Sequence, residues 1–581
     1  MRAQFLSSSS ERAVTCGFPS VVAFALLAAT AAAQSPTVGD TRPSDSRPTG
    51  ADSRGAAEDP TTVWFRTARP TNLKITLTAE AADSLRKEPR TFVRARLAET
   101  DGPVLAEVGI RLKGSAGSFR DFDDRPGFTI DCAKFGGTEL FHGLRRFHLN
   151  NAAQDDTLLR EGFAYETFRA AGYPAPFVSH ARVAVDARDL GVYVVKESYD
   201  QGFLLRRFGS AAANLYDGGA NGEVFDDLDL DVDLGVPDRA DLKRLAAACR
   251  ESDLDRRRIL LTAAIDIPRF LDFMALESLV DHWDGYTWNP NNYRLCFPAD
   301  SGRGFFIPHG MDQVFRDVDA RLFDPPRGAV ASVVLADPEL RAGYRSRLKA
   351  LLPLLSPPDA ADLRIVAAER RIAEFMKTAT PPEAFRGWRR AVRGFRNSVR
   401  ERAKFLAVEV DRPEPPVLRP DAAGLSLAAL EWRSHVEGDT VAETRGVGDA
   451  ERLVLRAGGN GRSIGSWRAQ AFVARGRYEL TCPVDLKDVV GLEGESTKGA
   501  GVRISGARRE SRDDPEGREG REGRDGRNGR KGPDEGTADS RPSRFTFEVE
   551  EAVQRVEFVL DLRARSGEAA FLRSGLKIAR R

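Results

Sequence analysis

Residues 281–315 read DHWDGYTWNPNNYRLCFPADSGRGFFIPHGMDQVF and contain the pattern on which the fold assignment depends. Two apolar runs, YRLCF and FFIP, flank ADSGRG, whose Asp, Ser and Gly residues favour turns, so the segment predicts a β-hairpin. In a hairpin the start of the first strand lies beside the end of the second. Asn291 and Asn292 should therefore lie beside Asp312 at one end of the hairpin, and the preceding loop brings Asp284 to the same end.

Two carboxylates and a side-chain amide in one place form a site of hard oxygen ligands, which suits Mg²⁺. Protein kinases use the same parts, namely a catalytic-loop Asp, a metal-binding Asn a few residues later, and a second metal-binding Asp after a strand pair. Asp284, Asn292 and Asp312 follow that order. The alternative is that Asp284 and Asp312 only cap turns at the hairpin base, and the spacing leaves both interpretations open.

Length and charge set the frame around this hairpin. A chain of 581 residues predicts about two or three domains. Its 87 Lys and Arg residues nearly balance 86 Asp and Glu residues, and the resulting net charge of +1 gives no argument for nucleic acid or an anionic membrane. The cysteines show no CxxC spacing that would indicate zinc or a redox pair.

Residues 1–34 predict a cleavable signal peptide. Arg2 and Arg12 precede a short apolar run that ends in small residues, with an A-x-A pattern at Ala31–Ala33. An uncleaved membrane anchor is the alternative, but the run is shorter than the ~20 apolar residues that a span needs. Residues 35–61 are rich in Ser, Thr, Pro, Gly and Asp and predict a disordered linker. We expect a secreted or periplasmic protein without a transmembrane segment after signal cleavage.

Residues 62–410 predict an α+β domain with sheet-forming sequence early and helices late. The runs NLKITLT, TFVRARLAE and AEVGIRLKG alternate apolar and polar residues, as half-buried strands of an antiparallel sheet do. Helices are expected at DDTLLREGFAYETFRAAG, with Asp155 or Asp156 as cap, and over residues 266–282, 338–354 and 359–410.

A second domain is expected after a proline-rich hinge at residues 411–420. Short alternating runs in residues 421–581 are typical of a β-sandwich. Glycine occurs at every third position from Gly517 to Gly532, but a collagen triple helix needs more triplets and frequent proline. We therefore expect a disordered loop near residues 508–542.

An ordered series of motifs, RLKG, HLNN, LLRE, GVYVVKE, NNYRL and HGMD, resembles the CotH family of spore-coat-protein-H-like atypical kinases. The resemblance extends over roughly residues 62–400. It implies a divergent protein-kinase-like domain that binds ATP with Mg²⁺ and phosphorylates Ser or Thr of secreted or cell-surface proteins. It also implies that Asp284 is the catalytic-loop aspartate, Asn292 a metal ligand, and Asp312 the second, metal-binding aspartate.

The phosphate end of such a site is less sharply defined. RLKGS supplies Arg111 and Lys113 beside a glycine turn, and cations in that setting suit ATP phosphates. Many family members carry a basic residue where this chain has Thr129. Three candidates for the phosphate contact follow: Arg125, Lys113 and Lys196. Glu161 would pair with this cation as the helix glutamate of kinases does, or it would simply face solvent.

Other polar patterns have weaker functional interpretations. His282 and His309 flank the aspartates, but no HExxH or HxH spacing supports a zinc hydrolase. The acidic run Asp226–Asp233 misplaces the glycine and glutamate of an EF-hand, so a solvated loop is expected. The basic helix at residues 386–405 should pack its apolar face on the domain rather than bind nucleic acid. In the second domain, three aromatics could stack on a glycan or belong to the core: Trp432, Trp467 and Tyr478.

Two classes of function remain. The first is an exported kinase with a secreted or cell-surface protein as substrate. The second is a non-catalytic surface scaffold or adhesion protein that keeps the kinase-like fold and uses the β-sandwich to bind glycan or protein partners. Retention of Asp284, Asn292 and Asp312 favours the enzyme. The Thr129 departure and the scarcity of ATP outside the cytoplasm favour the scaffold.

Overall fold

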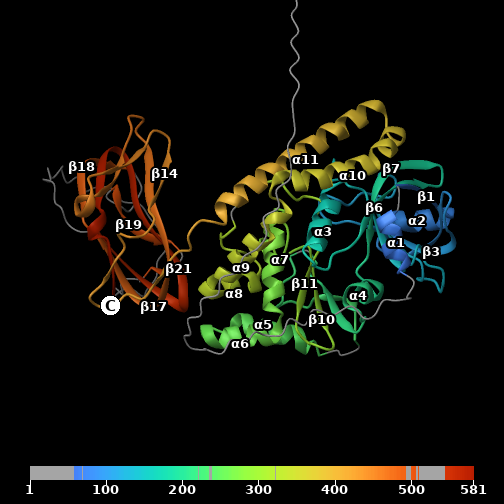
Figure 1. Cartoon of the computed structure of the whole chain (residues 1–581), viewed down its shortest axis with the longest axis horizontal. Coiled ribbons are helices and arrows are strands. Elements are labelled where there is room, and N and C mark those ends of the chain that lie inside the picture. Colours follow the sequence, from blue (N-terminus) through green and yellow to red (C-terminus); the bar gives the residue numbers. More distant parts are fainter. Residues whose placement is uncertain are drawn as a thin grey trace, which may run out of the picture. The chain divides into compact units, whose positions relative to one another are not determined.

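The computed structural model in Figure 1 describes residues 58–67, 70–219, 221–234, 238–320, 322–492, 499–505, 508–509 and 543–581. The predicted signal peptide, most of the predicted linker and nearly all of the predicted glycine-triplet loop lie outside these residues. Within the described residues, no helix is both long and apolar enough to span a membrane. The predicted linker ends earlier than expected, because helix α1 already begins at Pro60.

The early strands close into a barrel. Its hydrogen-bonded order is β1-β2-β3-β4-β5-β7-β6, and β1 pairs with β6 in parallel. The predicted alternation is present, since Leu73 and Ile75 of β1 are buried and Lys74 is exposed. The strands span Thr71–Thr76 (β1), Val93–Glu99 (β2), Val104–Lys113 (β3), Gly127–Asp131 (β4), Arg146–Asn150 (β5), Val178–Val185 (β6) and Arg188–Glu197 (β7). Helices α1 (Pro60–Thr67), α2 (Ala79–Lys87) and α3 (Arg160–Ala170) belong to the same stretch of chain.

A second, four-stranded sheet has the order β11-β10-β8-β9. The predicted hairpin is part of it, with Tyr293 paired to Pro308 and Cys296 to Phe305. Its strands are β8 (Ala213–Asp217), β9 (Asp229–Val232), β10 (Tyr293–Pro298) and β11 (Phe305–Pro308). The expectation of a solvated acidic loop is therefore wrong in part, because β9 lies inside that run and pairs with β8.

The helices after the barrel bury one hydrophobic cluster with this sheet. They are α4 (Gln201–Phe208), α5 (Ala240–Arg250), α6 (Leu254–Ala264), α7 (Ile267–Leu279), α8 (Ala329–Ala336), α9 (Pro338–Leu351), α10 (Pro358–Ala379) and α11 (Pro382–Glu409), with a short 3₁₀ turn at Leu352–Leu354. The predicted helix at 359–410 is broken between α10 and α11, where Pro381 and Pro382 follow each other.

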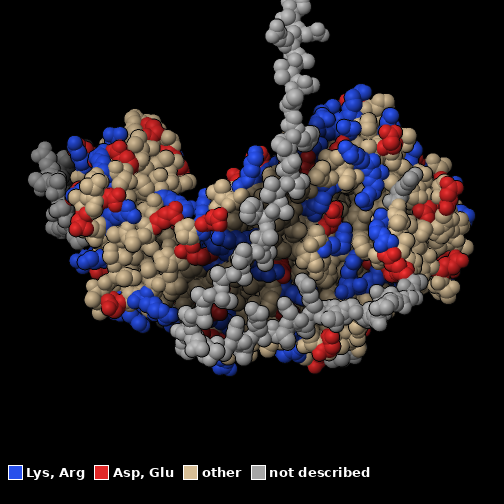
Figure 2. All heavy atoms as spheres, viewed as in Figure 1, with Lys and Arg blue, Asp and Glu red and all other residues tan. Residues whose placement is uncertain are grey.

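Helix α11 packs as the basic-helix pattern predicts. Its buried face carries Trp388, Phe395 and Leu406. Basic side chains gather over α10 and α11 on the face shown in Figure 2. Arg386 and Arg390 of α11 are exposed and lie near Glu383. Helix α3, in contrast, begins later than predicted: its N-cap position is Leu159, while Asp155 accepts the backbone N–H groups of Thr157 and Arg160.

The C-terminal segment has a hydrophobic cluster of its own. The expectation of short strands is wrong here, because β17 (Ser463–Cys482) has 20 residues and β21 (Ser543–Leu572) has 30. The other strands are β12 (Val417–Leu418), β13 (Leu425–Ser426), β14 (Arg433–Glu437), β15 (Val441–Arg445), β16 (Arg452–Arg456), β18 (Val484–Gly491), β19 (Ala500–Ser505), β20 (Arg508–Arg509) and β22 (Lys577–Arg580). They form one hydrogen-bonded 11-stranded sheet. A sandwich packing of this sheet stays a prediction.

Two details of this segment bear on the sequence-based expectations. Trp432, Trp467 and Tyr478 are buried, and both indole N–H groups donate to backbone carbonyls, so these aromatics belong to the core and present no stacking face. Two contacts fix the predicted hinge at residues 411–420. Glu414 accepts a hydrogen bond from Arg341 at 2.9 Å, and Val417–Leu418 pairs with β17.

Candidate functional site

A row of polar residues crosses the barrel on the face that points away from its core. The strand register aligns them, from β3 through β4 and β5 to β7, in the order Arg111, Thr129, His148 and Lys196. Their neighbours along each strand belong to the hydrophobic cluster of the barrel. Since side chains alternate between the two faces of a strand, the motifs RLKG, FTI, HLN and VKE contribute to one polar surface.

Lys196 and Glu161 form a buried ion pair on this surface. Lys196 Nζ lies 3.3 Å from Glu161 Oε1, and only 1% and 3% of the two side chains are exposed. Glu161 lies in the first turn of α3, and Asn150 of β5 donates its Nδ2 to the other carboxylate oxygen at 2.7 Å. The sequence left open whether Glu161 pairs with a cation or faces solvent. In the structure it forms the ion pair with Lys196.

Lys113 approaches the same carboxylate from β3. Its Nζ donates to Asn150 Oδ1. It passes over Gly127 of β4, where an added Cβ would lie 3.1 Å from Lys113 Cγ, so a glycine leaves room for the long side chain. Burial and the nearby Lys196 ammonium lower the pKa of Lys113 to about 7. Burial alone would raise the pKa of Glu161, but Lys196 and Lys113 outweigh it and hold that pKa below its ordinary value.

Asp284 lies in the loop between α7 and β10 and is surrounded by asparagine amides. Asn289 and Asn292 each donate to its carboxylate at 2.7 Å, and Asn291 donates to both oxygens at 3.1 Å. Asn292 also donates to the backbone carbonyl of Asp284. Three asparagine amides of TWNPNN thus fix the orientation of this carboxylate.

Glu277 of α7 supports this loop from below. Its two carboxylate oxygens accept the backbone N–H groups of Tyr286 at 3.1 Å and Thr287 at 2.9 Å. The side chain is fully buried, and burial raises its pKa to about 8. Gly285 is required here, because a Cβ would lie 2.2 Å from Glu277 Oε1.

His309 connects the aspartate loop, the end of the hairpin and Lys196. Its backbone N–H donates to the Asn292 carbonyl at 2.9 Å, and its carbonyl accepts from His282 Nε2 at 2.9 Å. Its Nδ1 lies 3.3 Å from Lys196 Nζ. Gly310 follows with φ +55°, and a Cβ there would lie 2.3 Å from Asn292 Oδ1, which explains the glycine of HGMD. His282 and His309 thus both make contacts within the protein, and these contacts hold the end of the hairpin in place.

Asp312 lies three residues beyond His309 and is half-buried. Burial, with the Glu161 and Asp155 carboxylates nearby, raises its pKa to about 7, while Lys113 acts in the opposite direction. Asp312 therefore lies within electrostatic reach of the Lys113–Glu161 cluster, and Asn292 connects the same hairpin end to Asp284. Hydrogen bonds and charges thus join six of the predicted site residues: Asp284, Asn292, Asp312, Glu161, Lys113 and Lys196.

Two predicted cations lie elsewhere. Arg125 donates to the carbonyls of Leu190 and Val192 and covers the ring of Tyr193, so it binds the β6–β7 hairpin rather than the Lys196 cluster. Arg111 stacks over Phe92 at 4.8 Å. It is three strands away from Lys196 in the row described above, which corresponds to roughly 14 Å at the usual strand spacing.

Three residues at this site were given no part in the kinase-like site by the sequence, although each lies in a quoted motif and His309 was considered as a zinc ligand. Asn150 comes from HLNN, His309 from HGMD, and Arg294 from NNYRL. Arg294 is buried and pairs with Asp231 at 2.6 Å and Asp217 at 2.7 Å. Only their place in these motifs could have indicated that the three residues belong to the site, because residue spacing does not reveal long-range contacts. Next to this region, a cavity of about 210 Å³ is lined by Arg145, Arg146, Asp200, Gln201, Asp231, Val232 and Asp233.

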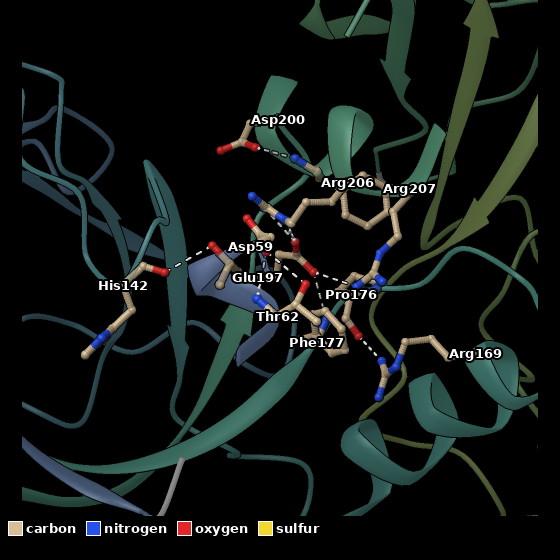
Figure 3. Close-up of polar contacts among 12 residues, drawn as sticks. Asp59, Thr62, His142, Arg169, Pro176, Phe177, Glu197, Asp200, Arg206 and Arg207 are labelled. Atoms are coloured by element: carbon tan, nitrogen blue, oxygen red, sulfur yellow. Dashed lines mark hydrogen bonds and ion pairs between the residues drawn. The ribbon is translucent and has the colours of Figure 1, made fainter. Parts of the chain in front are cut away.

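The residue after Lys196 anchors the strand. Glu197 is fully buried and pairs with Arg206 at 2.7 Å and Arg207 at 3.1 Å, both from α4. Figure 3 shows these arginines turned toward Glu197, beside Phe177. Phe177 donates its backbone N–H to Glu197, and its ring is covered by Arg207 and by Arg169 of α3. The cluster therefore fixes the end of β7 relative to α3 and α4.

The comparisons with known proteins agree with this arrangement. A family model described as CotH kinase protein matches residues 110–406, just over half of the chain. The chain belongs to this family. Inner spore coat protein H of Bacillus subtilis (strain 168) is similar to it, with 24% identity over 290 residues, which cover 46% of this chain and 78% of that relative.

Proposed function

We propose that this protein is an exported atypical kinase that transfers the γ-phosphate of ATP to Ser or Thr of a secreted or cell-surface protein. One observation supports this most: the buried Lys196–Glu161 pair lies beside the hairpin end that carries Asn292 and Asp312. A lysine–glutamate pair next to two aspartates and an asparagine is the set of parts that phosphoryl transfer by kinases requires.

The phosphates would enter next to Lys113 and Lys196. Both ammonium groups lie near the Glu161 carboxylate, and partial burial together with the nearby Lys196 ammonium lowers the pKa of Lys113 to about 7. An anionic phosphate at this place would favour the charged form of Lys113. Lys196 is held by Glu161 and His309 and is almost fully buried, so Lys113, which is half-exposed, is the better candidate for direct phosphate contact.

Asp312 and Asn292 fit a Mg²⁺ ion. Asp312 is crowded by the Glu161 and Asp155 carboxylates, and a cation would relieve this repulsion. Asn292 uses its Nδ2 for Asp284, which leaves its Oδ1 as a ligand. Among the described residues, no group of three His, Cys, Asp or Glu side chains is placed to hold a metal, but Mg²⁺ takes few protein ligands and keeps its waters. When bound, the ion would neutralise charge on the β- and γ-phosphates.

Asp284 is the candidate that handles the acceptor hydroxyl. Three asparagine amides hold its carboxylate in one orientation, and such fixed placement accounts for much of catalysis in phosphoryl transfer. Asp284 would accept the proton of the Ser or Thr hydroxyl as the bond to phosphorus forms.

The nucleoside would occupy the cavity near Arg146. Arg146, His148 and Asn150 alternate along β5, so they share one face and run from this cavity toward Glu161. Four residues of strand separate Arg146 from Asn150, which accepts from Lys113; this span of about 13 Å is comparable with the length of an extended nucleoside triphosphate. Asp200 and Asp231 in the lining offer acceptors for ribose hydroxyls or amino groups of the base.

Export is supported by the signal-like residues 1–34 and by the relative, which is named an inner spore coat protein. The acceptor would then be a protein that shares the secreted or surface compartment. The second candidate function is a non-catalytic scaffold. The following experiment distinguishes it from the kinase.

The test separates metal binding from proton handling. Asp312→Ala should abolish transfer of radiolabel from ATP to a Ser/Thr-rich acceptor and weaken metal-dependent nucleotide binding in calorimetry. Asp284→Ala should lower turnover about 10²-fold and leave nucleotide affinity largely intact. Asp300→Ala, in the turn of the same hairpin, serves as the matched control. A wild type that binds no nucleotide with any metal, or two variants that match it, would select the scaffold.

A further inference from the structure

Arg402 of α11 is one of the most deeply buried charged residues in the described chain, with 1% of its surface exposed. Its guanidinium donates to three backbone carbonyls. Nη2 donates to Ser278 at 2.5 Å, and Nη1 donates to Val318 at 3.2 Å and Ala320 at 2.7 Å. A buried arginine that satisfies carbonyls from separate segments fixes those segments relative to each other.

The segments that Arg402 joins are the two that carry the candidate aspartates. Ser278 is at the end of α7, and Asp284 follows six residues later. Val318 and Ala320 lie in the segment after Asp312. The two segments also meet directly, since the backbone N–H of Asp317 donates to Asp281 Oδ2 at 2.7 Å. Arg402 therefore contacts both the end of α7 and the segment after Asp312.

The same helix holds α3, which carries Glu161. Trp388 Nε1 donates to the Thr157 carbonyl at 2.8 Å, just before α3 begins. The ring of Phe395 lies 5.7 Å from Phe163 of α3 and 5.7 Å from Phe315 of the segment after Asp312. Helix α11 thus contacts every element, outside the barrel, that brings a carboxylate to the candidate site.

The segment after Asp312 has no residue that could receive a regulatory phosphate. Residues 313–331 contain no Ser, Thr or Tyr. In many kinases this segment is ordered when a phosphorylated residue pairs with arginine. Here an arginine from the chain's own α11 already binds the segment through its backbone carbonyls, and Asp281, Asp317 and Asp319 surround its charge.

We propose that Arg402 is a positioning residue for phosphotransfer, which holds the Asp284 loop and the segment after Asp312 in register without any modification of that segment. The effect of Arg402 on phosphotransfer rests on the proposed function. Its role in holding the two segments together can be tested without it. It requires that the segment be ordered in the chain as synthesised.

The test uses the full chain with Arg402→Met, Arg402→Lys and the control Arg396→Met. Arg396 lies on the same helix and pairs with Asp362 of α10, away from both segments. In Arg402→Met, amide hydrogen exchange should become faster in residues 281–288 and 313–322. Turnover should fall about 100-fold, while metal-free nucleotide affinity stays within about threefold, because the barrel lysines are untouched. Arg402→Lys, which keeps the charge but lacks the guanidinium fork, should recover only part of the turnover.

The outcomes distinguish the two proposals. If wild type shows no phosphotransfer, the proposed function fails, and exchange alone decides the role of Arg402. Unchanged exchange in both segments of Arg402→Met, or an equal effect of Arg396→Met, would overturn the positioning role. If Arg402→Met does not fold, Arg402→Lys and the wild type still decide: wild-type amides of residues 317–320 should exchange at least about tenfold more slowly than those of the exposed turn 299–303. Equal exchange would also overturn the proposal.

Discussion

At the scale of single residues, Glu161 is the group on which the proposed phosphate end of the candidate site depends. It is a buried carboxylate between two ammonium groups and one amide. The desolvation of such a pair costs nearly as much as the attraction returns, so the pair indicates specific placement more than stability. Removal of only one partner leaves a charge buried without compensation.

This gives a prediction that separates stability from activity. Glu161→Gln should destabilise the fold by about 3 kcal/mol, because Lys196 is left unpaired in a dry environment. The double variant Glu161→Gln/Lys196→Met should recover most of that stability and none of the phosphotransfer. Denaturant unfolding and radiolabel transfer measure the two effects. A double variant that stays as unstable as the single one would contradict this account of the pair.

Asp312 gives a prediction about pH. Its pKa in the folded protein is about 7, above the ordinary value of 3.8, so folding takes up a proton between these values and the contribution of Asp312 to stability is lost as pH rises through about 7. Metal binding needs the carboxylate, so metal affinity should rise over the same range, with Asp155, Glu161 and Lys113 titrating nearby. Affinity measured with Mn²⁺ alone should increase at least about tenfold between about pH 5.5 and about pH 8. In Asp312→Asn the increase should be absent; the same increase in that variant would assign it to another group.

At the scale of elements, the loop between α7 and β10 depends on the helix that precedes it. Glu277 lies in the last turn of α7 and accepts two backbone N–H groups of the loop. The loop contains Gly285, Tyr286 and Thr287, all buried, so its backbone donors have no access to water. One side chain therefore replaces the hydrogen bonds that a regular element would supply.

Variants of Glu277 test this dependence. Glu277→Ala should cost roughly 2–4 kcal/mol, because two buried N–H groups lose their acceptor, and should reduce turnover by displacing Asp284. Glu277→Gln should be tolerated better below pH 8, where the acid is largely protonated in the fold. Its folded pKa of about 8 lies above the ordinary value of 4.5, so wild-type stability from this group falls as pH rises between these values, and Glu277→Gln should remove that slope. An unchanged pH profile of unfolding in the glutamine variant would show that another group causes the slope.

At the scale of the whole molecule, the described residues contain three separate clusters of buried hydrophobic side chains. One fills the barrel, one lies among the helices and the four-stranded sheet, and one lies among β12–β22. Each predicted site residue belongs to the part of the chain that forms the first two clusters. The C-terminal segment supplies none of them.

We therefore predict that a chain truncated after residue 416 folds and keeps nucleotide affinity within about threefold of the full chain. It retains α11 and Glu414, which pairs with Arg341 and Arg345. Circular dichroism and calorimetry with ATP and Mg²⁺ check the two statements, and the full-length protein is the control. Loss of binding in a folded truncation would show that the C-terminal segment contributes to the site.

Local patterns predicted much of this molecule. The hairpin, the amphipathic face of α11, the alternation of β1 and the order of Asp284, Asn292 and Asp312 depend on neighbours along the chain, where side-chain period and turn chemistry act. The family resemblance was confirmed by the match over residues 110–406. Errors occurred where pairing is long-range: β9 gained strand partners, and β17 and β21 are far longer than their alternation indicated.

The sequence by itself determined which residue types are present for the proposed phosphotransfer and in what order they occur. Only the tertiary structure decided which cations reach Glu161. Arg125 and Lys113 are both cationic residue types, but the barrel register directs Lys113 over Gly127 toward Asn150 and leaves Arg125 on the carbonyls of β7. Arg402 could not be selected from the sequence either, because its partners lie 82 to 124 residues away. Contacts of this kind depend on how sheets and helices pack. Residue spacing along the chain does not show which distant residues will meet.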